Sequence, residues 1–136
     1  MTPIPVLTTH ALIAIGYAIP LLFAPADFLW LYGAEPDLDA LHLARLLGAA
    51  LVGVSAITWL AREAPEGPAL DAICFGLALG SSLATLITLG HQLLAPTAGL
   101  LGWSTILICA GLAGAYATLW LGRASRRTSP PTVTAG

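Results

Sequence analysis

Four long stretches of the chain are almost free of charged residues, and each is long enough for a membrane-spanning helix. No charged residue occurs between Asp71 and Arg123, which leaves room for two crossings of a hydrocarbon layer at about 20 residues per helix. Prolines and glycines separate the stretches, as is typical of turns. We therefore predict four transmembrane helices, over about residues 7–24, 41–61, 69–89 and 98–121.

The connections between the predicted helices are short, which favours antiparallel neighbours. The pattern therefore predicts an all-α protein whose single domain, residues 1–124, is an up-down bundle of four transmembrane helices. Residues 125–136 are rich in Ser, Thr and Pro, so we expect a disordered cytoplasmic tail there.

The composition favours a membrane protein over a soluble one. Hydrophobic residues make up 57% of the chain and charged residues 9%, whereas about 25% charged residues is usual in soluble domains. The net charge of −2 does not point to a charged partner. The partner that the composition predicts is the lipid bilayer, and the basic tail is too short to indicate nucleic acid.

The arginines predict how the bundle is oriented. Arg62 follows the second predicted helix and Arg123, Arg126 and Arg127 follow the fourth, whereas the loop 26–40 contains four acidic residues and no basic one. Because Lys and Arg accumulate in cytoplasmic loops, we expect the 62–68 loop and the C-terminal tail to be cytoplasmic. With four crossings, the N-terminus is then expected in the cytoplasm too.

One charged residue, Arg45, lies well inside a predicted helix, about one turn from its outer end. Ala49 and Ala56 fall on the same helix face as Arg45, so we predict that its side chain points into the bundle. An ionisable residue at such a place is a candidate functional residue. The candidate ligand-binding residues are Arg45 and four polar neighbours expected in the same outer half: His42, His91, Gln92 and Asp39.

Two other interpretations of Arg45 remain open at this point. Its side chain could extend to the membrane surface or pair with one acidic residue of the loop, a structural role. Alternatively, it could belong to a path for protons or ions. Such a path needs polar residues along its length, and the inner half of the bundle offers few.

Stripes of small residues predict where helices pack closely. Burial gives helices in lipid little hydrophobic gain, so their contacts depend on close approach through small side chains. We expect such contacts at two groups of residues, Gly48, Ala49, Gly53 and Ala56 in the second helix and Gly76, Gly80 and Ala84 in the third.

No motif in the chain indicates catalysis, a metal or a cofactor. The three histidines lack metal-ligand spacing. Cys74 and Cys109 are single thiols in apolar helices, without the Cys-x-x-Cys of membrane thiol oxidoreductases, so we interpret both as small core residues. We predict that the protein is not an enzyme and carries neither a metal nor a cofactor.

Several short motifs occur in a recognisable order along the chain. Leu31-Tyr32-Gly33 follows the first helix, Ala44-Arg45-Leu46-Leu47-Gly48-Ala49 lies in the second, which ends at Trp59-Leu60-Ala61-Arg62, and Leu101-Gly102-Trp103-Ser104 opens the fourth. This order resembles small bacterial four-helix inner-membrane proteins of DoxX-like layout. The resemblance implies a multi-pass bundle in the cytoplasmic (inner) membrane with Ala-Arg-Leu as a recurrent element, and it implies no reaction.

Two classes of function fit these observations. In the first, the chain is an accessory or assembly subunit that docks on a larger membrane complex, or forms a homo-oligomer, through its small-residue helix faces. In the second, it binds or transports a small lipophilic ligand at a polar site around Arg45 near the outer membrane face.

Overall fold

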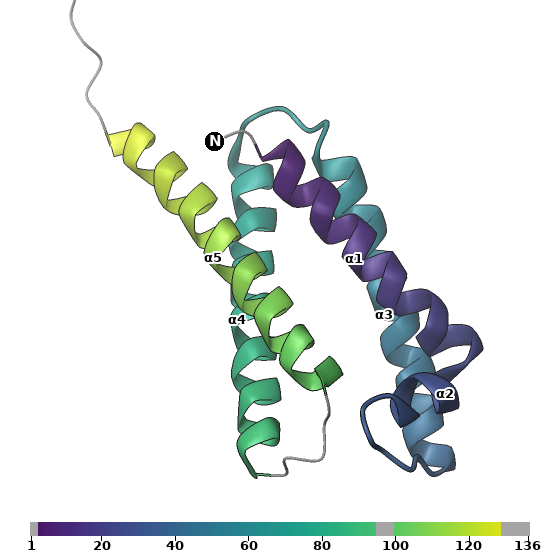
Figure 1. The fold of residues 1–136 in the computed structure, drawn as a ribbon. Coiled ribbons are helices and arrows are strands. Elements are labelled where there is room, and N and C mark those ends of the chain that lie inside the picture. Colours follow the sequence, from purple (N-terminus) through teal and green to yellow (C-terminus); the bar gives the residue numbers. More distant parts are fainter. Residues whose placement is uncertain (1–2, 95–99, 129–136) are drawn as a thin grey trace, which may run out of the picture.

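The computed structural model of the protein describes residues 3–94 and 100–128, and the regular secondary structure within these ranges is entirely α-helical. Its helices, shown in Figure 1, are α1 (Ile4–Phe23), α2 (Pro25–Trp30), α3 (Leu38–Ala61), α4 (Pro68–Leu94) and α5 (Leu100–Thr128).

Four of these helices are long and apolar enough to cross a membrane: Ile4–Phe23, Leu38–Ala61, Pro68–Leu94 and Leu101–Ser125. They correspond to the four predicted stretches and mark the chain as a multi-pass membrane protein. The start of α1, the 62–67 connection and the end of α5 lie at one end of the bundle (Figure 1).

The sequence pattern misjudged several helix ends. Helix α5 continues to Thr128, so the first four residues of the predicted disordered tail are helical. No proline occurs before Pro130 to stop the helix, and Ser and Thr weaken a helix only slightly. The rest of the predicted tail lies outside the described residues. Helix α3 begins at Leu38, where the Asp37 carboxylate accepts a 2.8 Å hydrogen bond from the Ala40 backbone N–H and caps the helix.

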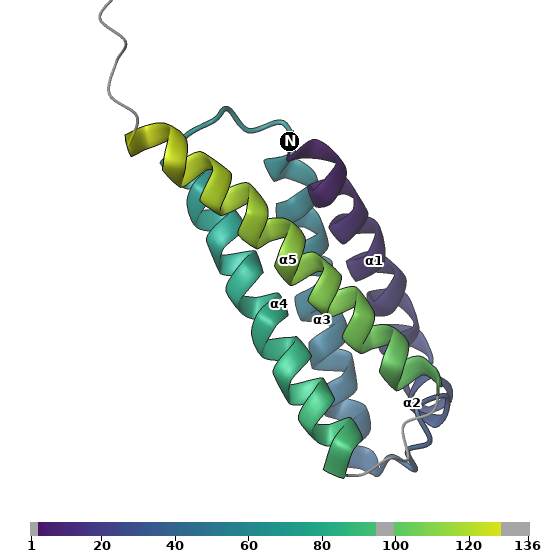
Figure 2. The same cartoon turned by 60° about the vertical axis from the view of Figure 1, so that its left-hand side comes forward.

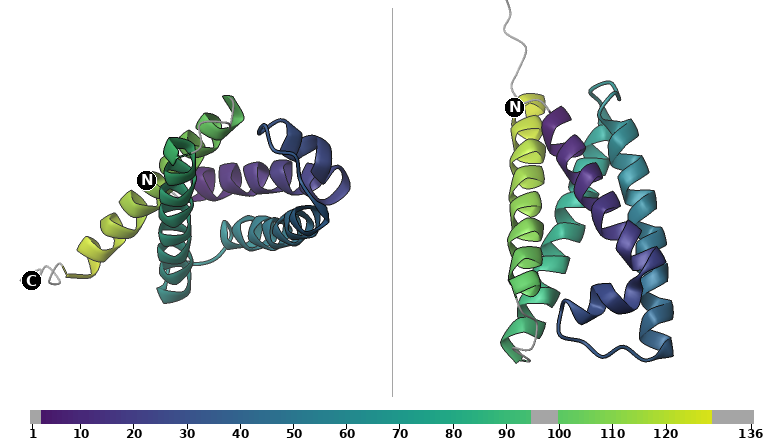
Figure 3. Two further views of the ribbon diagram at one scale, coloured as in Figure 1. Left: turned by 90° about the horizontal axis from the view of Figure 1, so that it is seen from below. Right: turned by 45° about the vertical axis from the view of Figure 1, so that its right-hand side comes forward.

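The short helix α2 was not predicted from the sequence. The backbone turns at Ala24, and Pro25 then occupies the first helical position, where its missing N–H has no intrahelical partner to lose. Gly33 ends the following turn with φ of 77°, a conformation that glycine adopts without strain. Figure 3 shows α2 lying across one end of the bundle, rather than along it.

The long helices form two pairs: α3 packs along α1, and α5 packs along α4. Helix α1 also contacts α5, which joins the pairs; Figure 2 shows α5 in front, crossing the bundle diagonally. The buried residues of α1 repeat at alternating intervals of four and three, which is the spacing of left-handed helix pairs. They are Leu7, Ala11, Ala14, Ala18 and Leu21.

The main hydrophobic core lies toward the end of the bundle that holds the 62–67 connection. There the first turns of α1 and α4 meet the last turn of α3 and the middle of α5. We call this region the packed end; its core residues are Leu7, Ala61, Leu70, Cys74, Leu112, Tyr116 and Leu119.

Candidate functional site

A cavity of about 600 Å³ lies between the two helix pairs. Every helix contributes to its wall. Helix α1 contributes His10, Ile13, Ala14, Tyr17 and Leu21; α2 and the turn after it contribute Phe28, Leu29 and Tyr32; α3 contributes Leu47, Leu51 and Val54; α4 contributes Gly76, Leu77, Gly80, Ser81 and Ala84; and α5 contributes Thr105, Ile108, Cys109 and Leu112.

The cavity lies at the middle depth of the four membrane spans. Its wall includes Ala14, Leu51, Gly80 and Leu112, each within about two residues of the centre of its own span. At 1.5 Å rise per residue, two residues correspond to ~3 Å along a helix. A molecule in this cavity would therefore lie mostly in the hydrocarbon layer, with the α2 end of the cavity bordered by Phe28, Leu29 and Tyr32 outside the four spans.

The wall of the cavity contains none of the Asp, Glu or Arg side chains that the structure describes. Leu47, Gly76 and Gly80 belong both to the wall and to the exposed surface, on α3 and α4. The cavity is thus open to the surroundings between α3 and α4, two helices that belong to different pairs. In a bilayer, that side faces lipid chains.

Three hydroxyl groups form a cluster at the α2 end of the cavity. Thr105 Oγ1 donates to the Leu101 carbonyl oxygen at 2.9 Å. The hydroxyls of Tyr17 and Tyr32 lie 3.2 and 2.7 Å from the same Thr105 oxygen. Because the Thr105 hydroxyl carries one proton, both phenols must donate to it. The cluster ties α1 and the turn after α2 to α5.

The cluster also changes the acidity of Tyr32, which lies outside the four membrane spans. Burial raises the pKa of Tyr32 to about 12, and the neighbouring Tyr17 reinforces this effect. Tyr32 therefore keeps its proton, and its bond to Thr105, at every physiological pH.

A second polar pair, His10 and Tyr116, lies between the cavity and the packed end. His10 Nδ1 is 3.0 Å from the hydroxyl of Tyr116, which is fully buried. A buried hydroxyl without an acceptor is costly, so the favoured tautomer has Tyr116 donating to an unprotonated Nδ1. The two rings are 5.5 Å apart between centroids and add an aromatic contact between α1 and α5.

The predicted inward orientation of Arg45 is wrong. Arg45 is exposed, whereas the neighbouring position Ala44 is buried against the bundle. The side of α3 that faces α1 follows Ala44, Gly48 and Ser55, with the Ser55 hydroxyl donating to the Ala11 carbonyl at 2.9 Å. One residue along a helix is a rotation of about 100°, which turns Arg45 away from α1.

The other predicted site residues are not brought together. His42, Asp39 and His91 are exposed, and Gln92 is buried. None of the five predicted ligand-binding residues lines the cavity. Within the described ranges, no group of three or more His, Cys, Asp or Glu residues is placed to hold a metal ion.

The small residues divide into three sets. Gly48 makes the expected close contact, because a Cβ there would lie 2.9 Å from Leu22 Cγ and 3.2 Å from the Ala18 carbonyl oxygen. Gly76, Gly80 and Ala84 border the cavity, and a Cβ on either glycine would meet no atom within 4 Å. Three further small residues of α3, Ala49, Gly53 and Ala56, lie on the exposed surface of this chain.

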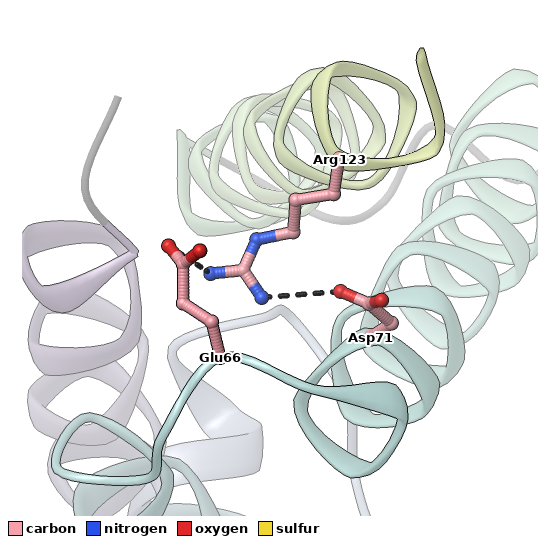
Figure 4. A network of polar contacts seen from close by, with 3 residues as sticks. All are labelled: Glu66, Asp71 and Arg123. Carbon is pink, nitrogen blue, oxygen red and sulfur yellow. Dashed lines mark hydrogen bonds and ion pairs between the residues drawn. The ribbon is translucent and has the colours of Figure 1, made fainter. Parts of the chain in front are cut away.

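A cluster of ion pairs lies at the packed end. Figure 4 shows Arg123 of α5 between Asp71 of α4 and Glu66 of the preceding connection. Arg123 is 7% exposed, and its Nη1 donates to Asp71 Oδ1 at 3.2 Å. Glu66 Oε1 lies 3.8 Å from Nη2, and the Glu66 side chain is 77% exposed.

Sequence reasoning missed both this cluster and the cavity. The sequence analysis used Arg123 only to predict the orientation of the bundle. Asp71 and Arg123, however, stand at the two ends of the longest charge-free stretch. When the two helices of that stretch pack antiparallel, its two ends come together and the residues form an ion pair. The signal for the cavity was the set of polar residues inside apolar stretches, above all His10, Tyr17 and Thr105.

Comparisons with known proteins give no relative. No protein-family model matches the chain, and no curated protein or solved structure shows significant similarity to it.

Proposed function

We propose that this chain is a multi-pass protein of the bacterial cytoplasmic membrane that binds a small lipophilic molecule between its two helix pairs. The observation that supports this most strongly is the cavity of about 600 Å³ at the middle depth of the four spans. Its volume falls in the range of ~300–1,000 Å³ that is usual for small-molecule sites. The proposed site replaces the polar pocket around Arg45.

The wall of the cavity explains why a lipophile would be held. Glycines at positions 76 and 80 leave space where larger side chains would fill it, and a Cβ on either glycine meets no atom within 4 Å. Atoms that line an empty space inside a protein lack the dispersion contacts that neighbouring atoms would provide. A bound apolar molecule restores those contacts without dehydrating any charged group.

Native mass spectrometry of the purified protein in mild detergent tests this function. The wild-type protein is expected to retain a lipophilic molecule, and Gly80→Leu is expected to lose it, because a leucine there extends into the cavity. Gly53→Leu is the matched control, since Gly53 is exposed on α3 and does not line the cavity. Equal retention by both variants, or no retained molecule in any of the three proteins, would sink the proposal.

A second candidate function is an accessory or assembly role. It is favoured by the exposed face of α3, which carries Arg45, Ala49, Gly53 and Ala56. Such a face permits close approach of another transmembrane helix. The same two variants distinguish the two functions. If Gly53→Leu loses a protein partner or an oligomeric state that Gly80→Leu keeps, the result supports the assembly role.

The proposed orientation places the N-terminus, the 62–67 connection and the end of α5 in the cytoplasm. The support is that these segments lie at one end of the bundle (Figure 1), together with Arg62 and Arg123. The ring of Trp59 lies 3.6 Å beneath the Arg62 guanidinium carbon, and such pairs are common at membrane surfaces.

A further inference from the structure

The hydroxyl groups of Tyr17, Tyr32 and Thr105 are hydrogen-bonded to one another, whereas two other polar groups of the wall, the Ser81 hydroxyl and the Nε2–H of His10 in the tautomer favoured above, are donors without a charge. The Thr105 hydroxyl donates to its own helix and accepts from Tyr17 and Tyr32, and His10 Nδ1 is occupied by Tyr116. The protons of both cavity-lining phenols are thereby used within the protein. No hydroxyl of this cluster has a proton left to donate to a bound head group.

None of the charged side chains that the structure describes lines the cavity wall. No Lys or Arg is present there to neutralise a phosphate or carboxylate, and no Asp or Glu to neutralise an amine. A charged group brought to the middle depth of the bilayer without a partner is strongly disfavoured. A charged head in the cavity would therefore have no neutralising partner.

The shape of the cavity is elongated along the helices. Its wall on α1 extends from His10 to Leu21, which corresponds to ~16 Å of helix at 1.5 Å per residue. Its open side, between Leu47 on α3 and Gly76 and Gly80 on α4, faces the hydrocarbon layer. An extended chain can pass through this opening from the membrane without crossing a polar surface.

From these three observations we infer that the cavity selects an uncharged hydrocarbon-chain molecule, which enters from the lipid layer between α3 and α4, and excludes chains with an anionic head. The inference rests on the proposed function and adds the chemical class of the ligand. Selection comes from the absence of any neutralising group at the depth of the cavity.

Two probes with the same chain but different heads provide the test: farnesol, which is neutral, and farnesyl phosphate, which is anionic. Thermal unfolding of the full chain in detergent micelles is followed by circular dichroism at equal mole fractions of each probe. Farnesol should raise the unfolding temperature of the wild type and of Gly53→Leu, but not of Gly80→Leu. Gly76→Leu repeats the blocked state at a second wall position in case Gly80→Leu does not fold.

Farnesyl phosphate should bind at least about tenfold more weakly than farnesol, since even the lowest insertion scales for a mid-membrane charge correspond to roughly fiftyfold or more. Equal or tighter binding of the phosphate at the same cavity would overturn the selection for uncharged chains and leave the proposed function standing. If neither probe produces a shift that the leucine variants abolish, both the inference and the proposed function fail.

Discussion

The packed end of the bundle and the region around the cavity hold their helices together in different ways. At the packed end, Leu7, Leu70 and Tyr116 leave almost no exposed surface and are backed by the Arg123–Asp71 ion pair. Around the cavity, the facing positions of α4 are Gly76 and Gly80, and the helices are linked by hydroxyl groups. Lipid solvates apolar side chains as well as a protein core does, so close contact is what stabilises helices in a membrane. Stability should therefore be concentrated at the packed end.

The largest expected effect comes from breaking the ion pair of the packed end. Asp71→Ala leaves the buried Arg123 with Glu66 at 3.8 Å, and we expect the free energy of unfolding to fall by about 3–5 kcal/mol. Glu66→Ala is the control: Glu66 is largely exposed, so its loss should cost less than about 1 kcal/mol. Denaturant unfolding in mixed micelles measures both values. Similar losses for the two variants would mean that Asp71 does not anchor this end.

Gly48 tests the contact between α1 and α3. Gly48→Ala places a Cβ 2.9 Å from Leu22 Cγ and 3.1 Å from Leu21 Cβ, and forcing the helices apart should cost about 1–3 kcal/mol. Gly53→Ala, on the same helix, meets nothing within 4 Å and should change stability by no more than about 1 kcal/mol, with a gain as the expected sign. The same unfolding assay compares the pair; a tolerated Gly48→Ala would contradict the close approach.

Thr105 tests how the α2 end is held. Thr105→Val removes the acceptor of Tyr17 and Tyr32, and we expect a loss of about 1–2 kcal/mol. Backbone hydrogen exchange should quicken in α2 and in the turn around Tyr32, while the first turns of α4 remain protected. Thr118→Val is the control on the same helix, because Thr118 is exposed and its hydroxyl bonds only to the nearby Ala115 carbonyl. Uniformly faster exchange along the chain would show that the two ends are not independent.

The smallest expected effect is a change with pH that is confined to the α2 end. The raised pKa of Tyr32, about 12, lies above the value of about 10 for an unfolded tyrosine. The neutral Tyr32 therefore contributes its stability fully below about pH 10, and this contribution is lost as the pH rises toward about 12. Absorbance at 295 nm, in the wild type minus Tyr32→Phe, should titrate near pH 12. A midpoint near 10 would indicate that Tyr32 is not buried against Thr105.

The sequence allowed the fold to be predicted well, because a span of the bilayer requires a long run of apolar residues whatever its neighbours are. Packing faces were harder to predict. Ala44 and Ala49 have the same side chain, and only the position of α1 decides that Ala44 is buried and Ala49 exposed. An error of one residue in that choice turned Arg45 inward in the prediction.

The candidate site was beyond sequence reasoning for a related reason. Cavity-lining residues such as Ile13, Leu51 and Leu112 are chemically the same as residues that face lipid. A cavity is the space that the packed helices leave empty. The size of that space depends on the angles between α1, α4 and α5. Only polar residues inside apolar stretches, such as Tyr17 and Thr105, signal it in advance.

The bond between His10 and Tyr116 also constrains how the protein is made. The two residues are 106 positions apart in the chain. At a synthesis rate of about 5–20 residues per second, the tyrosine follows the histidine by roughly 5–20 s. Both helices of the first pair, α1 and α3, have been synthesised before the end of that interval, while His10 still lacks its partner Tyr116. Closure of the bundle is thus a late event of biosynthesis, governed by the last helix to leave the ribosome.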